Sequence, residues 1–341
     1  GNFKEETNEK DTHTNILYIE KPLTEIALKI EISTEELKKR IDLARQKLFA
    51  ARKKRIPPHK DDKILTDWNG LMITALAKGA QVFGDPEYVN AAGRAADFIL
   101  RDMRRQDGRL LHRYREGHTA VLANVDDYAF MIWGLLELYE ASFDTRYLQS
   151  AWNLNTELVT RFWDKENGGF YFTADDAEEL IMRQKEIYDG ALPSGNSVAM
   201  LNLLRLGRIT ANSELEEKAM KIANVFASDV EKYPSGYAQF LVSLGFGLGP
   251  SYEVVVVGNP ELSDTKNMLA ALRKHFVPDK VLLFKPSNQE APDITRFADY
   301  TKYQSSIDNK ATAYICLNYA CNMPTTDVEK LLEQLQSPSR R

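Results

Sequence analysis

The sequence has few cysteines, few histidines and no long apolar run. Among its 341 residues there are two cysteines and five histidines. Two cysteines do not make a disulfide framework, so we expect a reducing, cytoplasmic environment. No apolar run reaches the roughly 18 residues of a membrane span, and no secretory signal is recognisable. We therefore expect no membrane contact.

The charge balance gives no basic excess. The formal net charge is -5 at pH 7, which lacks the electrostatic footprint of a nucleic-acid-binding protein. The locally basic run 38–63 is interpreted as a solvated helix face. With 43% hydrophobic residues, the chain can bury a core as one large domain or as one domain with an appendage.

Four short polar clusters each open an apolar segment with helical spacing. They are Asp67-Trp68-Asn69-Gly70, Asp126-Asp127-Tyr128, Ser194-Gly195-Asn196 and Ser235-Gly236-Tyr237. Similar turns at Asp85, Asp144 and Asn212 bring these openings into register. The repetition predicts helical hairpins whose openings gather at one end of a ring. The expected helices are 68–83 with 86–104, 127–142 with 145–163, 195–209 with 212–230, and a shorter one at 236–246.

The pattern changes near Pro250. A β-branched run at 252–257, a helical segment at 265–275 and an apolar run at 280–284 predict a small βαβ unit. A third strand is plausible at 311–317, and the strands are expected to be parallel and buried on both faces. We therefore expect three parts: an irregular segment 1–32, a helical toroid 33–249, and an α/β appendage with a tail at 250–341.

Several specific stretches carry a family resemblance. They are Gly1-Asn2-Phe3, the block 58–72 from Pro58 to Met72, Asp126-Asp127-Tyr128-Ala129, the block 189–197 from Asp189 to Ser197, and the tail 316–327. In these stretches the chain resembles the C-terminal half of the thioredoxin-domain-containing proteins related to spermatogenesis-associated protein 20. Their helical part is similar to six-hairpin glycosidases, in which inner-helix ends line the site.

The resemblance implies a mainly α fold, an incomplete (α/α)6 toroid with a small C-terminal βαβ subdomain. It implies a carbohydrate or another small polar molecule as ligand, and no cofactor. Nothing in the chain matches the thioredoxin-like domain, so the sequence is expected to begin midway through the toroid. A six-hairpin ring needs six inner helices, whereas this sequence shows four helix openings. An apolar flank of the ring would therefore be left uncovered. We expect this flank to contact the N-terminal half of the same protein or to drive self-association.

Acidic residues near the openings are the candidate catalytic groups. Asp67, Asp126 and Asp127 stand at helix starts, and Asp62 and Asp189 lie in adjoining loops. Glycosidic cleavage needs one carboxyl group as proton donor and another as base or nucleophile. A single aspartate at such a position is more often a simple helix cap. However, one cap does not need two adjacent acids.

Candidate ligand-binding residues share the same openings and loops. Flat rings there could stack on a sugar while amides and cations bind its polar groups. Aromatic residues at helix starts also commonly pack between helices, and a loop histidine is commonly solvated. The candidates are His59, Lys63, Trp68, Asn69, Tyr128, Tyr171, Lys185, Ser194, Asn196 and Tyr237.

Three functions remain open from the sequence. The first is hydrolysis of a carbohydrate by paired carboxylates. The second is sugar epimerisation, which would need His59, His112 or His118, or residues of the absent half. The third is a non-catalytic toroid that binds a glycan or protein for the thioredoxin-like domain. No metal site is expected.

The cysteines are expected to be chemically inert. Cys316 and Cys321 are too far apart for a CxxC redox motif, and no second pair exists for a zinc site. We expect two buried thiols. The family resemblance offers the alternative that they exchange with the thioredoxin-like domain.

Overall fold

The computed structural model describes residues 3–5, 15–178 and 181–336. The chain divides into two compact units, Gly1–Asp62 and Lys63–Arg341. None of the described helices is both long enough and apolar enough to cross a membrane.

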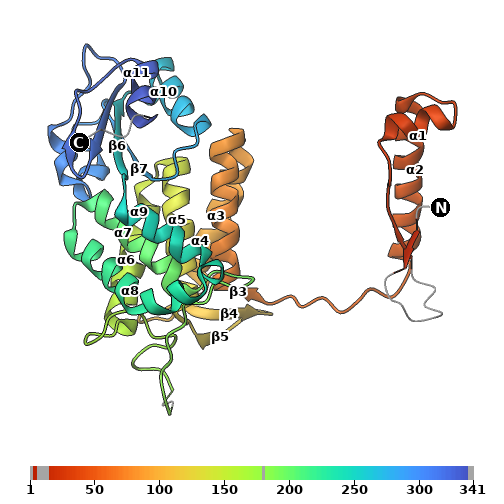
Figure 1. Ribbon diagram of the computed structural model, residues 1–341, viewed down its shortest axis with the longest axis horizontal. Helices are drawn as coiled ribbons and strands as arrows, with labels where there is room; N and C mark the ends of the chain where they lie inside the picture. Colours follow the sequence, from red (N-terminus) through yellow and green to blue (C-terminus); the bar gives the residue numbers. More distant parts are fainter. Residues whose placement is uncertain (1–2, 6–14, 179–180, 337–341) are drawn as a thin grey trace. The chain divides into compact units, whose positions relative to one another are not determined.

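The first unit combines a short antiparallel strand pair with two helices (Figure 1). Strand β1 (Phe3–Glu5) pairs with β2 (Asn15–Leu17), and α1 (Leu23–Lys29) precedes α2 (Thr34–Lys53). Ser33 caps α2, because its hydroxyl oxygen accepts the backbone N–H of the third helical residue. Helix α2 lies within the first unit. The domain boundaries expected at residues 32 and 249 stay predictions.

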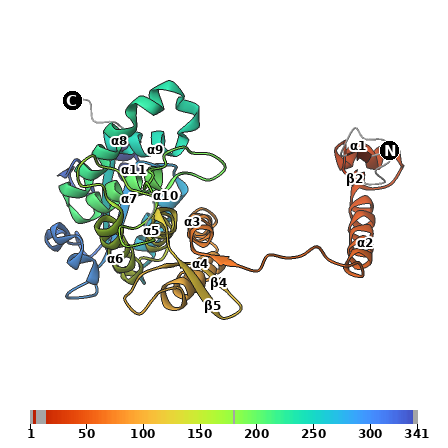
Figure 2. The ribbon, with the colours of Figure 1, turned by 90° about the horizontal axis from the view of Figure 1, so that it is seen from below.

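The second unit is built on helical hairpins, as expected (Figures 1 and 2). Its hairpin helices are α3 (Thr66–Phe83) with α4 (Pro86–Asp102), α5 (Val125–Ser142) with α6 (Thr145–Phe162), α7 (Gly195–Thr210) with α8 (Ser213–Lys232), and α9 (Ala238–Leu248) after the 3₁₀ turn η1 (Pro234–Gly236). Helix α3 packs on α5, α5 on α7, and α7 on α9, while each outer helix packs on its own partner. This arc of inner helices confirms the expected incomplete toroid.

The three hairpins share one turn design. Each inner helix ends at a residue with left-handed φ, and the next residue caps the outer helix with its side-chain oxygen. The left-handed residues and their following caps are Gly84 with Asp85, Phe143 with Asp144, and Ala211 with Asn212. The register inferred from the turn sequences is therefore confirmed.

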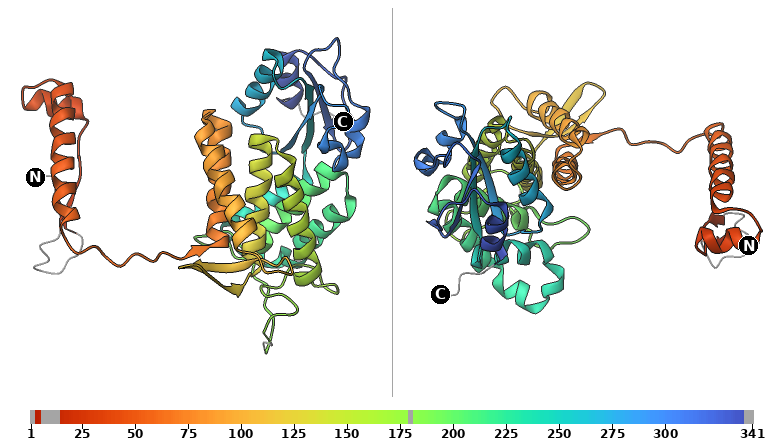
Figure 3. Two further views of the ribbon diagram at one scale, coloured as in Figure 1. Left: turned by 180° about the vertical axis from the view of Figure 1, so that it is seen from behind. Right: turned by 90° about the horizontal axis from the view of Figure 1, so that it is seen from above.

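A three-stranded sheet lies at the end where the inner helices begin, and a four-stranded sheet lies at the other end (Figure 3). The first sheet contains β3 (Ile64–Leu65), β4 (Leu111–Arg115) and β5 (His118–Leu122). Strand β3 leads directly into α3, and β5 precedes α5. This sheet therefore holds two helix starts next to β4.

The C-terminal sheet has the order β7-β6-β8-β9. Its elements are β6 (Tyr252–Gly258), α10 (Ser263–Lys274), β7 (Lys280–Pro286), the 3₁₀ turns η2 (Asp293–Arg296) and η3 (Asp299–Tyr303), β8 (Thr312–Leu317), β9 (Ala320–Cys321) and α11 (Val328–Gln336). Strands β6 and β7 are parallel and α10 connects them, which confirms the βαβ unit. The expectation that the third strand is also parallel is wrong, because β8 runs antiparallel to β6.

The β-branched run is buried on both faces of this sheet. Val255 and Val257 pack in the core of the hairpins. Val254 and Val256 face a second core together with α10 and α11. The sheet therefore shares its inner face with the helical arc, and the hairpins and the sheet form one compact unit.

The two cysteines form a disulfide. Cys316 of β8 faces Cys321 of β9 in antiparallel register, and their sulfur atoms are bonded. The expectation of two inert thiols is wrong, because the tight turn between β8 and β9 brings together residues that are five positions apart. The sequence spacing gives no sign of this turn until the strand pairing is known.

Both end helices of the arc expose apolar side chains. On α3, Trp68, Met72 and Val82 are exposed, and on α9, Val242 and Leu248 are exposed. This matches the expected apolar flank, since the described arc is open at α3 and α9. Self-association remains a proposal.

The crossing of α3 over α5 depends on two glycines. A Cβ at Gly70 would lie 2.5 Å from the carbonyl carbon of Phe130, and one at Gly134 would lie 2.8 Å from the carbonyl oxygen of Gly70. Because both obstacles are backbone atoms, neither can rotate away. The two helices can approach this closely only without side chains there.

We predict that Gly70→Ala destabilises the protein by about 2 kcal/mol or more, because the added methyl group forces the two helix backbones apart. Gly245→Ala is the matched control, since no atom lies within 4 Å of its added Cβ. This control should change stability by less than about 1 kcal/mol, in the stabilising direction. Urea unfolding measures both variants. Equal stabilities of the two variants would contradict the close crossing.

Candidate functional site

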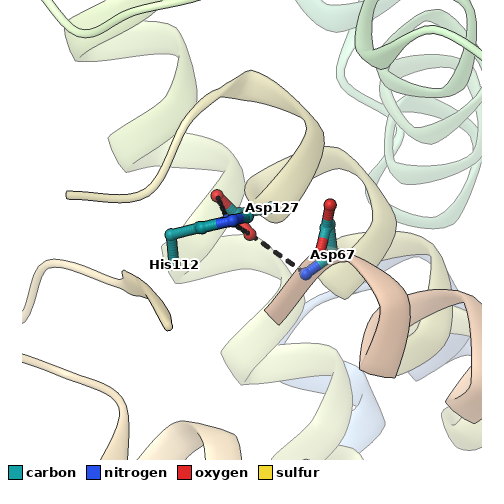
Figure 4. A group of neighbouring side chains, drawn as sticks. All are labelled: Asp67, His112 and Asp127. Carbon is teal, nitrogen blue, oxygen red and sulfur yellow. Dashed lines mark hydrogen bonds and ion pairs between the residues drawn. The ribbon is translucent and has the colours of Figure 1, made fainter. Parts of the chain in front are cut away.

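One buried carboxylate joins three elements at the end where the inner helices begin. Asp127 is fully buried on α5. Its Oδ1 accepts the backbone N–H of Asp67 at 3.0 Å, and its Oδ2 accepts that of Asn124 at 2.8 Å. The Nδ1 of His112 lies 2.9 Å from Oδ1 and 3.1 Å from Oδ2 (Figure 4). Asp127 thereby connects the starts of α3 and α5 to strand β4.

Helix capping explains Asp127 but not the acid beside it. Asn124 accepts the N–H groups of Asp126 and Asp127, and Asp127 completes the capping box of α5. Helix α3 has no side-chain cap at Leu65, so the bond from Asp67 to Asp127 satisfies one of its free N–H groups. The carboxylate of Asp126 is not needed to cap α5.

His112 is held in one orientation by Asp127. Its hydrogen bond to Asp127 raises the pKa of the imidazole, and burial opposes this shift. The negative charges of Asp127, Asp67 and Asp126 raise it further. In the neutral ring, an Nδ1–H that donates to Asp127 leaves Nε2 as the acceptor. Nε2 is therefore the atom that can take a proton from a ligand.

Asp126 is a carboxyl group suited to hold a proton near neutral pH. Burial, together with the charges of Asp127 and Glu186, raises its pKa to about 7. A backbone hydrogen bond from Gly195, the first residue of α7, opposes this shift. A Cβ at Gly195 would overlap the Asp126 carboxylate. The glycine thus lets the acid reach the start of α7.

Asp67 completes the group. Burial and the charge of Asp127 raise the pKa of its carboxyl group, and its Oδ1 accepts the N–H of Trp68 at 2.7 Å. Asp67, His112 and Asp127 offer atoms within 4.8 Å of one another, a spacing that could hold a cation. However, both oxygens of Asp127 already accept protein hydrogen bonds. The arrangement therefore suits proton transfer better than metal binding.

Asp189 lies between the starts of α7 and α9. Its Oδ1 accepts the N–H of Ser194, and its Oδ2 accepts that of Phe240, both at 2.9 Å. Ser194 caps α7. Both oxygens of Asp189 are thus used by backbone groups, which indicates a structural rather than a catalytic role.

Tyr237 is half-buried. Its ring packs edge-on against the ring of Tyr188, and the two ring centres lie 6.1 Å apart.

Tyr128 and Asn196 require correction, because both belong to the folded framework. Tyr128 is 1% exposed, and its hydroxyl donates to Glu157 at 2.7 Å. Asn196 is fully buried; it accepts the N–H of Phe170 and donates to the carbonyl oxygens of Phe170 and Glu186. Neither side chain can contact a ligand without unfolding its surroundings.

The predicted residues in the loop after α6 bind other parts of the protein. Lys185 donates to Asp164 at 2.7 Å and to the carbonyl oxygen of Gly168 at 2.6 Å. The hydroxyl of Tyr171 also donates to Asp164, at 3.0 Å. The ammonium group of Lys185 is therefore already neutralised by a carboxylate.

On α3, the side-chain amide of Asn69 donates to the backbone carbonyl oxygen of Leu65.

The remaining predicted residues fall on both sides of the division between the units. His59 and Asp62 lie in the first unit, and Lys63 begins the second. Their predicted roles stay predictions. The sequence connects His112 only with epimerisation, and it presents Gly195 only as part of a helix-opening motif. Their contacts with the acids arise from the β4 pairing and the approach of α7, which the sequence order does not reveal.

Comparison with known proteins confirms the resemblance. The chain is 30% identical to human spermatogenesis-associated protein 20 over 323 residues, which is 92% of this chain and 41% of the human protein. It is 31% identical to the mouse protein over 333 residues, 94% of this chain and 42% of that protein. The chain thus spans about two fifths of the length of these relatives. No family model matches.

Solved structures of carbohydrate-active enzymes show partial similarity. An α-mannanase of glycoside hydrolase family 76 from Bacteroides thetaiotaomicron matches with a TM-score of 0.44 and 17% identity, over 73% of this chain and 72% of the mannanase. Cellobiose 2-epimerase from Bacillus thermoamylovorans matches with a TM-score of 0.42 and 17% identity, over 50% of this chain and 46% of the epimerase.

We predict that Asp127→Asn lowers the pKa of His112, because the variant removes the charge and the strong acceptor that stabilise the imidazolium. NMR titration of the ring protons measures this, with His112→Gln used to assign the signals. Asp126→Asn is the control and should lower the pKa less, since it removes only a weaker charge interaction. A wild-type pKa at or below 6.5 would contradict the geometry without any variant.

We also predict that Asp126→Asn stabilises the protein by about 1 to 2 kcal/mol at neutral pH. The unfolded carboxyl group loses its proton near 3.8 and the folded one near 7, so ionisation lowers the free energy of unfolding progressively between these values. The variant avoids this loss, and its advantage should therefore be absent near pH 4 and complete above about 7.

Urea unfolding at several pH values measures this advantage, with Asp229→Asn on the surface of α8 as the control. A stability difference between wild type and Asp126→Asn that does not change with pH would refute the assignment.

Proposed function

We propose that the protein performs acid/base chemistry on a carbohydrate at the end of the arc where α3, α5 and α7 begin. The observation that supports this most directly is Asp126, whose pKa is raised to about 7 beside the His112–Asp127 pair. A carboxyl group with this pKa costs stability when it is ionised, and its backbone hydrogen bond from Gly195 only partly offsets that cost. Such perturbed groups cluster at catalytic sites.

Hydrolysis uses these groups as follows. Protonated Asp126 donates its proton to the glycosidic oxygen as the bond to the anomeric carbon breaks. Water adds to that carbon and gives its proton to the carboxylate of Asp67. The His112–Asp127 pair holds the start of α3 in place and supplies positive charge when it is protonated. Proton exchange with solvent then returns Asp126 and Asp67 to their initial states.

The surroundings of Asp67 suit a sugar. Trp68 follows it directly and is 60% exposed, so its ring is available to stack on the apolar face of a pyranose. Such a ring supplies the flat apolar surface that carbohydrate sites combine with a few polar groups.

Epimerisation is the second candidate, and the orientation of His112 favours it. With Nδ1 fixed by Asp127, neutral Nε2 can remove a proton from the carbon next to a sugar carbonyl group. Asp126 can then return a proton to that carbon. This reaction needs no water as a reactant, so the two candidates can be separated experimentally.

We predict that Asp126→Asn lowers the rate of glycoside hydrolysis by about 10² to 10⁴, because the leaving oxygen then lacks its proton donor. The loss should be much smaller for aryl glycosides with acidic leaving groups, which need no protonation. Wild-type activity should fall as pH rises through about 7, since Asp126 then loses its proton. The assays measure released reducing ends and released phenol, with Asp229→Asn as the control.

For epimerisation, free sugars are incubated in D₂O, and NMR follows deuterium uptake at the carbon next to the carbonyl group. His112→Gln should abolish this uptake. Sugar binding without any turnover would support a binding toroid and contradict the enzyme proposal. Neither turnover nor binding across a panel of glycosides and free sugars would remove the carbohydrate proposal altogether.

A further inference from the structure

A cavity of about 600 Å³ lies on the inner side of the arc. Its walls come from α3, α5, α7 and α9, and the segment 272–282 between α10 and β7 closes one side. The side chains most important to it are Lys78, Trp133, Glu137, Arg205, Arg273 and Lys280. All of these belong to the second unit.

This cavity is separate from the acid/base group. On α5, Glu137 follows Asp126 by 11 positions, which corresponds to roughly 16 Å along a helix. The cavity is lined by residues of α10 and β7, whereas Asp67 and Asp126 stand in the first turns of α3 and α5. The ribbon shows the four-stranded sheet and the three-stranded sheet at opposite ends of the inner helices (Figure 3). The cavity therefore needs a function of its own.

The acids of its wall already have cationic partners. Arg205 is buried and donates to Glu137 at 2.6 Å and to Glu140 at 2.8 Å. Lys78 adds a third contact, 3.0 Å from Glu137. The negative charges of Glu137 and Glu140 are thus offset by α3 and α7 across the wall, which leaves little attraction for a further cation.

Two further cations of this wall have no direct acidic partner, although the charge of Glu140 acts on both from a longer distance. Among the described residues, neither Arg273 nor Lys280 forms an ion pair. Arg273 donates through Nη2 to the carbonyl oxygens of Glu140 and Ala141 at the end of α5, and its Nε is buried with no partner among those residues. Lys280 donates to the carbonyl oxygen of Val277 at 2.9 Å. Burial lowers the pKa of both groups, a cost that a bound anion would offset.

We infer that this cavity binds a small phosphorylated molecule of sugar size, with its phosphate at Arg273 and Lys280. Its volume lies within the usual range for small-molecule sites. The half-buried ring of Trp133 and the side chains of Val242 and Phe246 supply apolar wall for the rest of the ligand. The inference does not rest on the proposed carbohydrate chemistry.

The test measures binding of glucose 6-phosphate, inorganic phosphate, glucuronate and glucose by calorimetry and thermal shift. Wild type should bind glucose 6-phosphate in the micromolar to low millimolar range and melt at a higher temperature with it. Inorganic phosphate should bind more weakly, and glucose should not bind. Tighter binding of glucuronate than of glucose 6-phosphate would overturn the assignment of a phosphate.

Lys280→Met should weaken binding of glucose 6-phosphate roughly tenfold or more, because one charged hydrogen bond is lost. Lys266→Met is the matched control: it lies on α10 beside Glu261, outside the cavity lining, and should bind as wild type does. Val242→Trp fills the cavity from an exposed position without changing charge, and it should also abolish binding.

Asp126→Asn should retain full affinity, which separates this site from the acid/base group. The inference is overturned by the absence of glucose 6-phosphate binding in wild type, or by equal binding in wild type, Lys280→Met and Val242→Trp. Loss of activity in Asp126→Asn with unchanged binding of glucose 6-phosphate is the result expected if both proposals hold. If wild type turns over a sugar but does not bind glucose 6-phosphate, only the phosphate inference fails. If wild type binds glucose 6-phosphate but turns over no sugar, only the acid/base proposal fails.

Discussion

The carboxylate of Asp127 is the interaction on which this end of the molecule depends. It completes the capping box of α5, satisfies a backbone N–H of α3 and fixes the ring of His112 on β4. Because the group is fully buried, each of its bonds replaces a hydrogen bond to water that the folded chain cannot make. Helix capping, strand placement and imidazole orientation are therefore parts of one hydrogen-bonded network.

The hairpins could be predicted from the sequence because their signals are local. The residues at Asp85, Asp144 and Asn212 cap outer helices directly, so the turn sequences set the register of the repeat. The direction of β8 could not be predicted in this way. Strand direction depends on how the chain returns to the sheet, and a short apolar run contains no information about that path.

The sequence predicted which acidic residues gather at this end of the arc, but it did not predict the environment of each one. Acids at two helix starts predicted that Asp67, Asp126 and Asp127 meet at one end of the arc, and they do. Their catalytic use stays a prediction. Asp127 is fully buried and orients His112, whereas Asp126 has the raised pKa. The two residues are adjacent in the sequence, so the sequence does not show which of them has which environment. Asp189 and Asn196 looked equally suitable, yet backbone groups use their polar atoms completely.

The glycine at the start of α7 has a consequence for how this chain could lose or keep its chemistry. Asp127 would be retained in an inactive descendant, because α3 and α5 still need it. Asp126 accepts one backbone N–H, that of Gly195 at the start of α7, and the missing side chain at Gly195 makes room for it. Because ionised Asp126 costs stability, a lineage that lacks the proposed chemistry should replace this acid and then fill the space at Gly195. That pair of positions is therefore the better marker of the proposed activity among distant relatives.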